Sequence, residues 1–312
     1  MSGIHVIAPG MLTTVQDLGR EGFGSMGVSP SGAADAVALR VGNRLVGNAE
    51  GAAGLEMTLV GGVFLFPEGG VIALTGSDFG ASVAEARVEM WASVELRAGE
   101  TLRVAATKAG ARCYLCVRGG IAVEAFLGSA STHLLSGLGG FEGRALRKGD
   151  LLRVYDTERL WVQRKLTAQA LQSLSPRKVL RVTAGVQAHK FSDAARDLFF
   201  GGVYRVREDS NRTGLRLEGP SVAAPEGGAM ITEGIALGAV QVPESGQPII
   251  SFVEQQTTGG YPVIANVISV DLSSVGQLRP RDEARFELVE MEVARELLLE
   301  QEKLLATDGI FQ

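Results

Sequence analysis

GGVFLFPEGGVIALTG, residues 61–76, contains two short apolar runs separated by Pro-Glu-Gly-Gly. Each run is shorter than a typical helix, and the Pro and Gly residues between them favour a tight turn. The stretch therefore predicts two strands, over 62–66 and 71–76, joined by a turn.

The same pattern continues on both sides of this stretch. Short runs rich in Val, Ile, Leu and Tyr are bounded by Gly, Pro, Asp or Glu, and the chain contains 41 glycines. A spacing of ~8–12 residues per strand is typical of sandwiches and barrels. We predict a mainly β fold whose further strands cover residues 81–90, 101–107, 111–119, 151–155, 178–185, 202–207, 214–219, 228–234, 239–244, 248–254, 262–272 and 284–291.

Few segments have helical periodicity. Residues 31–48 begin with Ser31 as a candidate N-cap, carry apolar residues on one face and end at Gly47 and Asn48. Residues 192–200 follow a Ser-Asp cap, and residues 289–305 are charged and amphipathic. We predict a helix in each of these three segments.

The joint between two β-rich halves is predicted within residues 158–178, where the strand pattern pauses. The resulting division is a first β-rich half, a second β-rich half, and a C-terminal helix with its tail. Their predicted bounds are 1–165, 166–288 and 289–312.

The composition argues against several classes of partner. The formal net charge at pH 7 is −5, so there is no excess of Lys and Arg for a nucleic-acid surface. The first residues lack the pattern of a secretory signal, and no apolar run approaches the ~20 residues that a membrane helix needs. We expect a cytoplasmic protein that binds neither nucleic acid nor a membrane.

The two cysteines of the chain have Cys-x-x-Cys spacing. A redox pair of this spacing lies at the start of a helix, and a zinc site needs further ligands. Cys113 and Cys116 instead lie within a predicted strand, where residues three apart point to opposite faces. The three histidines are scattered along the chain. We interpret both cysteines as buried apolar residues and predict no metal site.

The stretch VQDLGREGFGSMGVSPSGAAD, residues 15–35, combines an acidic and a basic residue with repeated glycines. In one interpretation, Asp17 and Arg20 pair and stabilise a turn. In the other, the loop around Gly24 approaches a ligand, and the helix amino terminus that follows favours an anion. The residues alone leave both interpretations open.

A second basic candidate lies in EDSNRTGLRLEGP, residues 208–220. Arg212 follows an Asx-type turn, and its planar guanidinium suits a carboxylate or a phosphate. An exposed structural arginine is the equally weighted alternative.

Residues 255–264, QQTTGGYPVI, contain more hydrogen-bonding groups than a turn needs. Gly259 and Gly260 permit close approach of a ligand to the backbone. The Thr and Gln side chains supply paired donors and acceptors for a carbonyl or amide group. A wide hairpin loop with self-satisfied polar groups is the alternative, but the number of polar groups favours a ligand site.

These stretches together resemble the allophanate hydrolase subunit 2 family over roughly residues 3 to 287. That family includes the C subunit of bacterial 5-oxoprolinase and part of the carboxyltransferase domain of urea amidolyase. The resemblance is carried, in order, by QDLGREGFGSMGV, SGAADAVALRVGNRLVGN, GLEMTL, LCVRGGIAV, LGSAST, SNRTGLRLEGP, GAVQVPESGQPI and QTTGGYPVIANVISVDL.

The resemblance implies a cyclophilin-like β-barrel architecture and a separate, similar B subunit as partner. In the oxoprolinase branch, the B and C subunits use ATP, with Mg, to activate the lactam of 5-oxoproline, and an A subunit completes ring opening to glutamate. In the urea amidolyase branch, the homologous domain moves a carboxyl group from biotin to urea. A stand-alone chain of this length, without a Met-Lys-Met biotin-attachment sequence, is more similar to the 5-oxoprolinase C subunit.

Both chemistries develop negative charge on oxygens beside a planar amide, and such charge requires preorganised donors. Two sets of residues are expected to supply them or to hold them in place. The expected catalytic residues are Arg20, Arg212, Glu254, Thr257 and Thr258. The expected substrate-binding residues are Asp17, Gly24, Gln241, Gln256, Gly259, Gly260 and Tyr261.

The chain departs from the family pattern at two positions. Family members tend to have Asp where this chain has Asn211, and Asp where it has Glu254. A non-catalytic regulatory partner of a kinase-inhibitor-like subunit is therefore a further hypothesis. Replacing Arg212 by Ala would leave such a partner functional, whereas an enzyme would lose most of its turnover.

Overall fold

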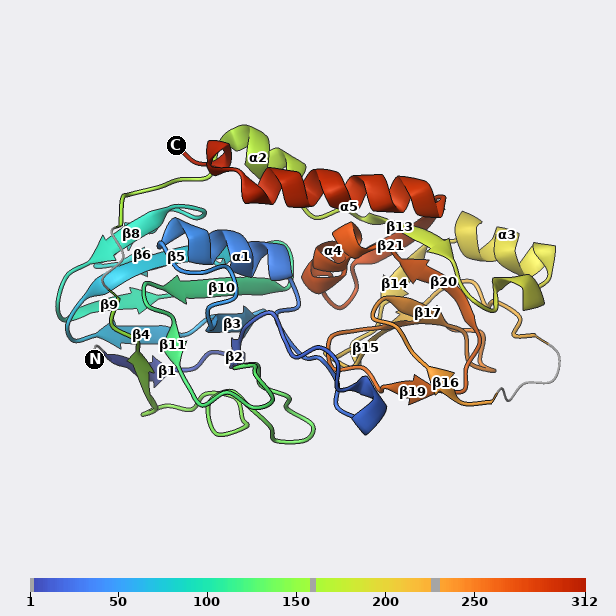
Figure 1. Cartoon of the computed structure of the whole chain (residues 1–312), viewed down its shortest axis with the longest axis horizontal. Coiled ribbons are helices and arrows are strands. Elements are labelled where there is room, and N and C mark those ends of the chain that lie inside the picture. The colour runs from blue at the N-terminus through green and yellow to red at the C-terminus, as the bar shows by residue number, and fades with distance from the viewer. Residues whose placement is uncertain (1–2, 158–160, 226–230) are drawn as a thin grey trace. The chain divides into compact units, whose positions relative to one another are not determined.

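The computed structural model describes residues 3–157, 161–225 and 231–312, with the elements labelled in Figure 1. The chain forms two compact units that interleave along the sequence. Unit 1 contains Met1–Arg20, Ser31–Leu174 and Thr307–Gln312; unit 2 contains Glu21–Pro30 and Ser175–Ala306. The predicted bounds at 165/166 and 288/289, by contrast, cut the chain into consecutive pieces. Residues 158–160 of the predicted joint lie outside the described residues.

Unit 1 consists of two antiparallel sheets with few helices. One sheet has seven strands in the order β11-β12-β1-β4-β9-β6-β7, and the other has five in the order β2-β3-β10-β5-β8. The elements are β1 Gly3–Ala8, β2 Leu12–Gln16, α1 Ala36–Leu45, β3 Gly54–Thr58, β4 Val63–Phe66, β5 Gly70–Gly76, β6 Ser82–Val83, β7 Ala86–Arg87, β8 Ser93–Leu96, β9 Glu100–Arg103, β10 Arg112–Val117, β11 Ile121–Ala122, β12 Leu151–Val154, α2 Ala168–Ser173 and the 3₁₀ turn η4 Asp308–Ile310.

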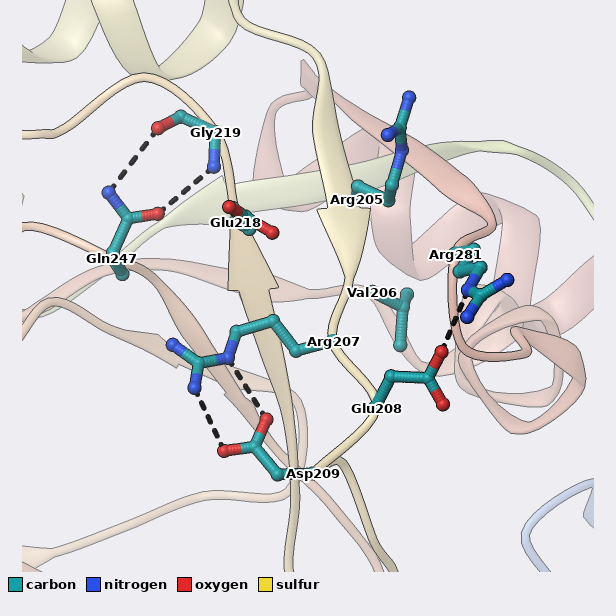
Figure 2. A pocket seen from close by; sticks show the side chains of 9 residues that line it. All are labelled: Arg205, Val206, Arg207, Glu208, Asp209, Glu218, Gly219, Gln247 and Arg281. Atoms are coloured by element: carbon teal, nitrogen blue, oxygen red, sulfur yellow. Dashed lines mark hydrogen bonds and ion pairs between the residues drawn. The ribbon is translucent and has the colours of Figure 1, made fainter.

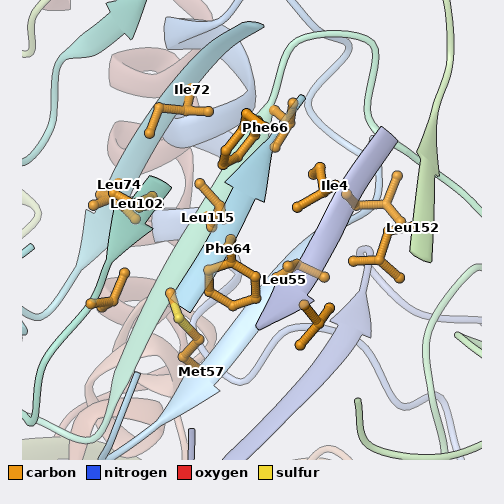
Figure 3. Packing of buried hydrophobic residues seen from close by; sticks show 14 of the residues in the cluster. Ile4, Leu55, Met57, Phe64, Phe66, Ile72, Leu74, Leu102, Leu115 and Leu152 are labelled. Atoms are coloured by element: carbon orange, nitrogen blue, oxygen red, sulfur yellow. The ribbon is translucent and has the colours of Figure 1, made fainter. Parts of the chain in front are cut away.

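The main hydrophobic core of unit 1 lies between the two sheets and consists of their buried side chains (Figure 3). In β4, Phe64 and Phe66 are buried while the alternate residues are less buried, as expected for a strand with one covered face. In β10 every residue is buried, because α1 covers the opposite face of its sheet. The stretch 61–76 therefore forms the predicted strand–turn–strand unit, as β4 and β5.

Cys113 and Cys116 confirm the interpretation drawn from their spacing. Cys113 belongs to the core between the sheets, whereas the Cys116 thiol faces α1, with its Sγ 3.7 Å from the Leu39 carbonyl oxygen. A Cβ added at Gly42 would lie 2.7 Å from that Sγ, so α1 needs a glycine at this close approach. Both cysteines are free and fully buried.

Burial raises the pKa of both thiols, because the thiolate loses its hydration. We expect the native protein to resist iodoacetamide at pH 8, whereas the unfolded chain takes up two equivalents. Mass spectrometry of labelled native and urea-unfolded samples measures this difference. Rapid labelling of the native protein would show that the strand opens to solvent.

Unit 2 contains a closed barrel, in the strand order β13-β20-β17-β18-β15-β14-β21. All neighbouring pairs are antiparallel except β13 with β21, which closes the barrel in parallel. The elements are η1 Gly24–Met26, β13 Val179–Ala184, η2 Ala188–Lys190, α3 Asp193–Gly201, β14 Tyr204–Val206, β15 Gly214–Glu218, β16 Glu233–Gly234, β17 Ala239–Gln241, β18 Ile249–Ser251, β19 Thr258–Gly259, β20 Val263–Val267, η3 Ser269–Asp271, α4 Leu272–Gln277, β21 Glu283–Leu288 and α5 Met291–Ala306.

The structure confirms the predicted mainly β class with a barrel, and it confirms the helices expected at 192–200 and 289–305 as α3 and α5. Ser192 caps α3 by accepting a hydrogen bond from the Ala195 N–H. Along α3, Phe199 stacks on Phe286 of β21, with ring centroids 4.5 Å apart. This contact packs the helix against the buried side of β21.

Three local predictions were wrong. The strand predicted over 262–272 ends with β20 at Val267, and the chain continues as η3 and α4. Ser31 does not cap α1, because its φ is 55° and its hydroxyl accepts a hydrogen bond from Arg20; Asp35 is the cap, accepting from the Ala38 N–H. The single strand predicted over 81–90 is instead the hairpin β6–β7, because Ala84 and Glu85 both have positive φ.

Residues 228–230 of the strand predicted at 228–234 lie outside the described residues. In the described part of this segment, Glu233–Gly234 form β16. Among the helices that the structure describes, none is long and apolar enough to cross a membrane.

Candidate functional site

The candidate site of unit 2 is built around an ion pair between Arg212 and Glu254. Arg212 precedes β15 and Glu254 follows β18, and the Glu254 N–H donates to the Arg212 carbonyl at 2.8 Å. This bond extends the antiparallel pairing of the two strands, so the side chains lie next to each other. The Arg212 Nε–H donates to Glu254 Oε1 at 2.5 Å. Both residues are buried, with 5% and 4% of their surface exposed.

Asn211 forms the predicted Asx-type turn beside this pair. Its Oδ1 accepts hydrogen bonds from the N–H groups of Thr213 and Gly214, at 2.8 and 3.3 Å. An amide oxygen performs this role as well as a carboxylate does. The departure from the family's Asp therefore leaves the turn that positions Arg212 intact.

Gln255 is the residue of this corner that sequence reasoning missed. Its backbone N–H donates to the Phe252 carbonyl in a turn, so strand alternation gives no guide to the direction of its side chain. The side chain is 6% exposed, and its Nε2 donates to the Ile235 carbonyl at 3.1 Å. Among the residues that the structure describes, its Oε1 has no hydrogen-bond partner.

Gln241, at the end of β17, shows the complementary arrangement. Its side chain is 7% exposed, and its Oε1 accepts from the Ser251 hydroxyl at 3.4 Å. Its Nε2 has no partner in the described part of the chain. Within the described residues, Gln241, a predicted substrate residue, therefore has a donor without a partner. Gln255, which the sequence did not single out, has an acceptor without a partner in the same part of the chain.

A short ribbon, formed by β16 and β19, borders both glutamines. Glu233 pairs with Gly259 and Gly234 with Thr258. Gln187 fixes the ribbon to the barrel: its Nε2 donates to Glu233 and its Oε1 accepts from the Val263 N–H, both at 3.0 Å. Within the QTTGG stretch, Thr258 and Gly259 thus form one strand of a ribbon at the barrel.

The predicted residues on this ribbon are more accessible than the ion pair. Gln256 and Thr258 are exposed, Thr257 and Gly259 are partly buried, and Tyr261 is 51% exposed. Gly260 is partly buried as well. These residues are therefore at least partly accessible to solvent, and their predicted roles in catalysis and binding stay predictions.

The loop of residues 21–30 belongs to the same unit, although it lies more than two hundred residues away in sequence. The Ser29 hydroxyl donates to the Gln255 carbonyl oxygen, and Ser29 is buried. Gly24 lies in η1 of this loop and is exposed. The loop therefore supports the backbone at Gln255, which the sequence did not indicate.

Asp17 and Arg20 lie in unit 1, in a network of their own. The Asp17 carboxylate accepts hydrogen bonds from the N–H groups of Gly19 and Ala130 and from the hydroxyls of Ser129 and Ser131, at 2.5 to 2.8 Å. This carboxylate therefore ties residues 17–19 to residues 129–131. The predicted use of Asp17 in substrate binding stays untested, but its oxygens are already occupied.

The Arg20 side chain likewise forms its hydrogen bonds with groups of the protein itself. Its guanidinium donates to the carbonyls of Phe126 and Ser131 and to the Ser31 hydroxyl, and it lies 5.5 Å from the Phe126 ring centroid. Only 2% of the residue is exposed. One interpretation had Asp17 and Arg20 pair directly; these hydrogen bonds connect them through Ser131, whose hydroxyl donates to Asp17 and whose carbonyl accepts from Arg20.

A groove of about 870 Å³ lies elsewhere on the outside of the barrel, along β14 (Figure 2). Its charges neutralise one another: Arg207 pairs with Asp209 at 3.0 Å and Arg281 with Glu208 at 2.7 Å. The Gln247 amide bonds to both the N–H and the carbonyl of Gly219. The groove is therefore a polar surface with paired charges, and the predicted site residues lie outside it.

Comparison with known proteins relates this geometry to one family. Residues 26–288 match the model of the carboxyltransferase domain, subdomain A and B. Relatives include the 5-oxoprolinase C subunit of Escherichia coli, 38% identical over 275 residues, covering 88% of this chain and 87% of that protein. The Haemophilus influenzae 5-oxoprolinase C subunit is 35% identical, covering 91% of this chain and 90% of that protein.

A solved structure shows the same fold. The K. lactis urea amidolyase matches 99% of this chain with a TM-score of 0.90 and 30% sequence identity, and the match occupies 21% of that protein. This chain thus corresponds to about a fifth of the urea amidolyase. The sequence motifs, the two-unit β architecture and these matches lead to one conclusion: the chain belongs to the carboxyltransferase domain family.

Proposed function

We propose that this chain is the C subunit of an ATP-dependent 5-oxoprolinase and acts with a B subunit to activate the lactam of 5-oxoproline for ring opening to glutamate. The observation that carries the proposal is the extent of the matches. The chain covers 87% and 90% of two 5-oxoprolinase C subunits, but only 21% of the K. lactis urea amidolyase. The match therefore extends over nearly the whole of the two 5-oxoprolinase C subunits, whereas it is one part of the larger urea amidolyase.

The candidate site supplies what lactam activation requires. Charge develops on the lactam oxygen during activation, and a buried, preoriented N–H stabilises such charge more strongly than water does. Gln241 Nε2 is a donor of this kind. Arg212 and Glu254 bond to each other, so in this proposal they position Gln255, the residue that follows Glu254.

The two arginines predicted to be catalytic, Arg20 and Arg212, do not fit a nucleotide. A triphosphate needs several cationic or N–H donors directed at it. The Nε of Arg212 is bonded to Glu254, and the Arg20 side chain donates to Phe126, Ser31 and Ser131. In this proposal these two arginines therefore take no part in ATP chemistry. The ATP requirement, with Mg, is proposed for the complex with the B subunit, with an A subunit as the further partner.

Carboxyl transfer to urea is the second candidate, favoured by the family model and by the TM-score of 0.90. Bound carboxybiotin would supply the carboxyl group. The ureido ring of biotin and urea itself both carry a C=O and N–H groups, which the open atoms of Gln241 and Gln255 fit. Under this second proposal, these two side chains would orient the amide groups of the reactants.

The test is a comparison of ATP hydrolysis by this chain, by its B subunit and by the co-purified complex, with and without 5-oxoproline. We expect turnover that needs both chains and 5-oxoproline. A parallel assay supplies a biotinylated carrier with its carboxylase, and urea. Turnover only in the urea assay would replace the first function by the second, and a complex without either activity would favour the regulatory hypothesis.

A further inference from the structure

Three buried side-chain polar atoms in the described residues of unit 2 have no hydrogen-bond partner: Tyr204 OH, Gln241 Nε2 and Gln255 Oε1. Buried polar groups are nearly always satisfied, and an exception requires an explanation. Gln241 and Gln255 lie in different segments but border the same ribbon, and they are complementary, because one is a donor and the other an acceptor. A bound molecule that carries both functions would satisfy them together.

Ile235 and Gly259 bring the two amides to one place. The Ile235 backbone donates to the Thr257 carbonyl and accepts from Gln255 Nε2. A Cβ added at Gly259 would lie 2.3 Å from Ile235 Cδ1 and 3.0 Å from Gln241 Nε2. Gln255 therefore contacts Ile235, and Gln241 lies beside Gly259, which in turn adjoins the Ile235 side chain.

The carbonyl of Ile235 fixes the orientation of the Gln255 amide, and the structure places the Gln241 amide with its oxygen toward the Ser251 hydroxyl. Gln255 Nε2 faces a carbonyl, so the free atom of this amide is the acceptor oxygen. Gln241 Oε1 faces the Ser251 hydroxyl, so the free atom of this amide is the donor nitrogen. Exchanging O and N at Gln255 would place two oxygens against each other at Ile235.

We propose that Gln241 and Gln255 together bind one edge of a planar cis amide, with Gln241 donating to its C=O and Gln255 accepting from its N–H. This inference rests on the proposed function for the identity of the amide, which is then the 5-oxoproline lactam. A lactam or a urea presents C=O and N–H on the same edge, whereas a trans peptide presents them on opposite edges. The pair thus selects cyclic amides and ureas.

The test compares 5-oxoproline with its lactone analogue, in which a ring oxygen replaces the N–H. Isothermal titration calorimetry measures both ligands against the full-length chain in complex with its B subunit. We expect the wild-type complex to bind the lactone about tenfold to a hundredfold more weakly, because two acceptors then face each other at Gln255.

Two substitutions separate the roles of the amides. Gln255→Met is expected to weaken lactam binding by at least about tenfold and to leave lactone binding nearly unchanged, so the discrimination disappears. Gln241→Met is expected to weaken both ligands by a similar factor, because both carry the C=O. Gln247→Met is the matched control: this amide lies on the same barrel with both ends bonded to Gly219, and its loss should change neither affinity.

Urea serves as a third ligand and separates the inference from the proposed function. If urea binds in a Gln255-dependent manner and 5-oxoproline does not bind, the inference stands and the oxoprolinase proposal fails. If the complex turns over 5-oxoproline but Gln255→Met keeps the wild-type preference for lactam over lactone, the inference is overturned and the proposal stands. Absence of binding by all three ligands overturns the inference as well.

Gly259→Ala gives an independent check that leaves both amides in place. Because Ile235 is only partly buried, the ribbon can shift to accept the methyl group, and the protein should still fold. The shift moves Gln241 Nε2, so we expect lactam and lactone to bind about tenfold more weakly, with unchanged discrimination between them. Wild-type affinity in this variant, measured by the same calorimetry, would contradict the placement of the ligand beside Gly259.

Discussion

Replacing Arg212 by Ala is expected to lower the free energy of unfolding by about 3–5 kcal/mol, because Glu254 then stays buried without its cationic partner. Both residues are at least nine-tenths buried, and Nε lies 2.5 Å from Oε1, so water screens this pair little. Urea denaturation followed by circular dichroism measures the change.

The double variant Arg212→Met, Glu254→Gln is the control for this prediction. It removes both charges, so we expect it to recover most of the stability that Arg212→Ala loses. If the free energy of unfolding of Arg212→Ala stays within about 1 kcal/mol of the wild-type value, Glu254 has found another partner and the prediction is wrong.

The burial of Arg212 changes which variant can distinguish the enzyme hypothesis from the regulatory hypothesis. From the sequence, loss of function in Arg212→Ala indicated an enzyme. In the structure, Arg212 is part of the packed interior, so its loss disturbs any function of the barrel. The informative variant is therefore the stable double variant: an enzyme whose Gln255 depends on the pair should lose turnover, whereas a regulatory partner should still bind its sister subunit.

Replacing Asp17 by Ala is expected to lower the free energy of unfolding by about 3 kcal/mol, because two N–H groups and two hydroxyls lose a charged acceptor. Residues 129–131 would then separate from residues 17–19, and Arg20 would lose its fixed contact with the Ser131 carbonyl. The same denaturation experiment measures this loss.

Asp17→Asn should fall between the wild type and the alanine variant. Its single carbonyl oxygen replaces one carboxylate oxygen, while its amide nitrogen opposes a donor on the other side. If Asp17→Ala keeps wild-type stability and loses only substrate affinity, Asp17 is a binding residue, as the sequence predicted, and the network is secondary.

The sequence predicted the class of the fold because its signals are local. Short apolar runs between Gly and Pro determine strands wherever they occur, and β4, β5 and β10 follow directly from them. The local signals failed where a backbone conformation depended on distant contacts. Ser31 has the right chemistry for a cap, but Arg20 binds its hydroxyl and φ is positive.

Part of the candidate site was also predictable from local chemistry. Glycines and amides in residues 255–264 indicated a ligand site, and Arg212 with Glu254 were selected as functional. Gln255 was missed because it follows a turn, where strand alternation does not fix the direction of a side chain. Its open oxygen becomes visible only once its nitrogen is seen to bond with Ile235.

The sequence by itself determined the mainly β class, the family and the polar character of the corner, because each depends on residue type and order along the chain. Only the tertiary structure decided which polar atoms have a hydrogen-bond partner within the protein and which do not. That decision depends on partners far apart in sequence, such as Asp17 with Ser131 and Ser29 with Gln255. A hydrogen bond satisfies a group by distance in space, and that distance exists only after the strands have paired.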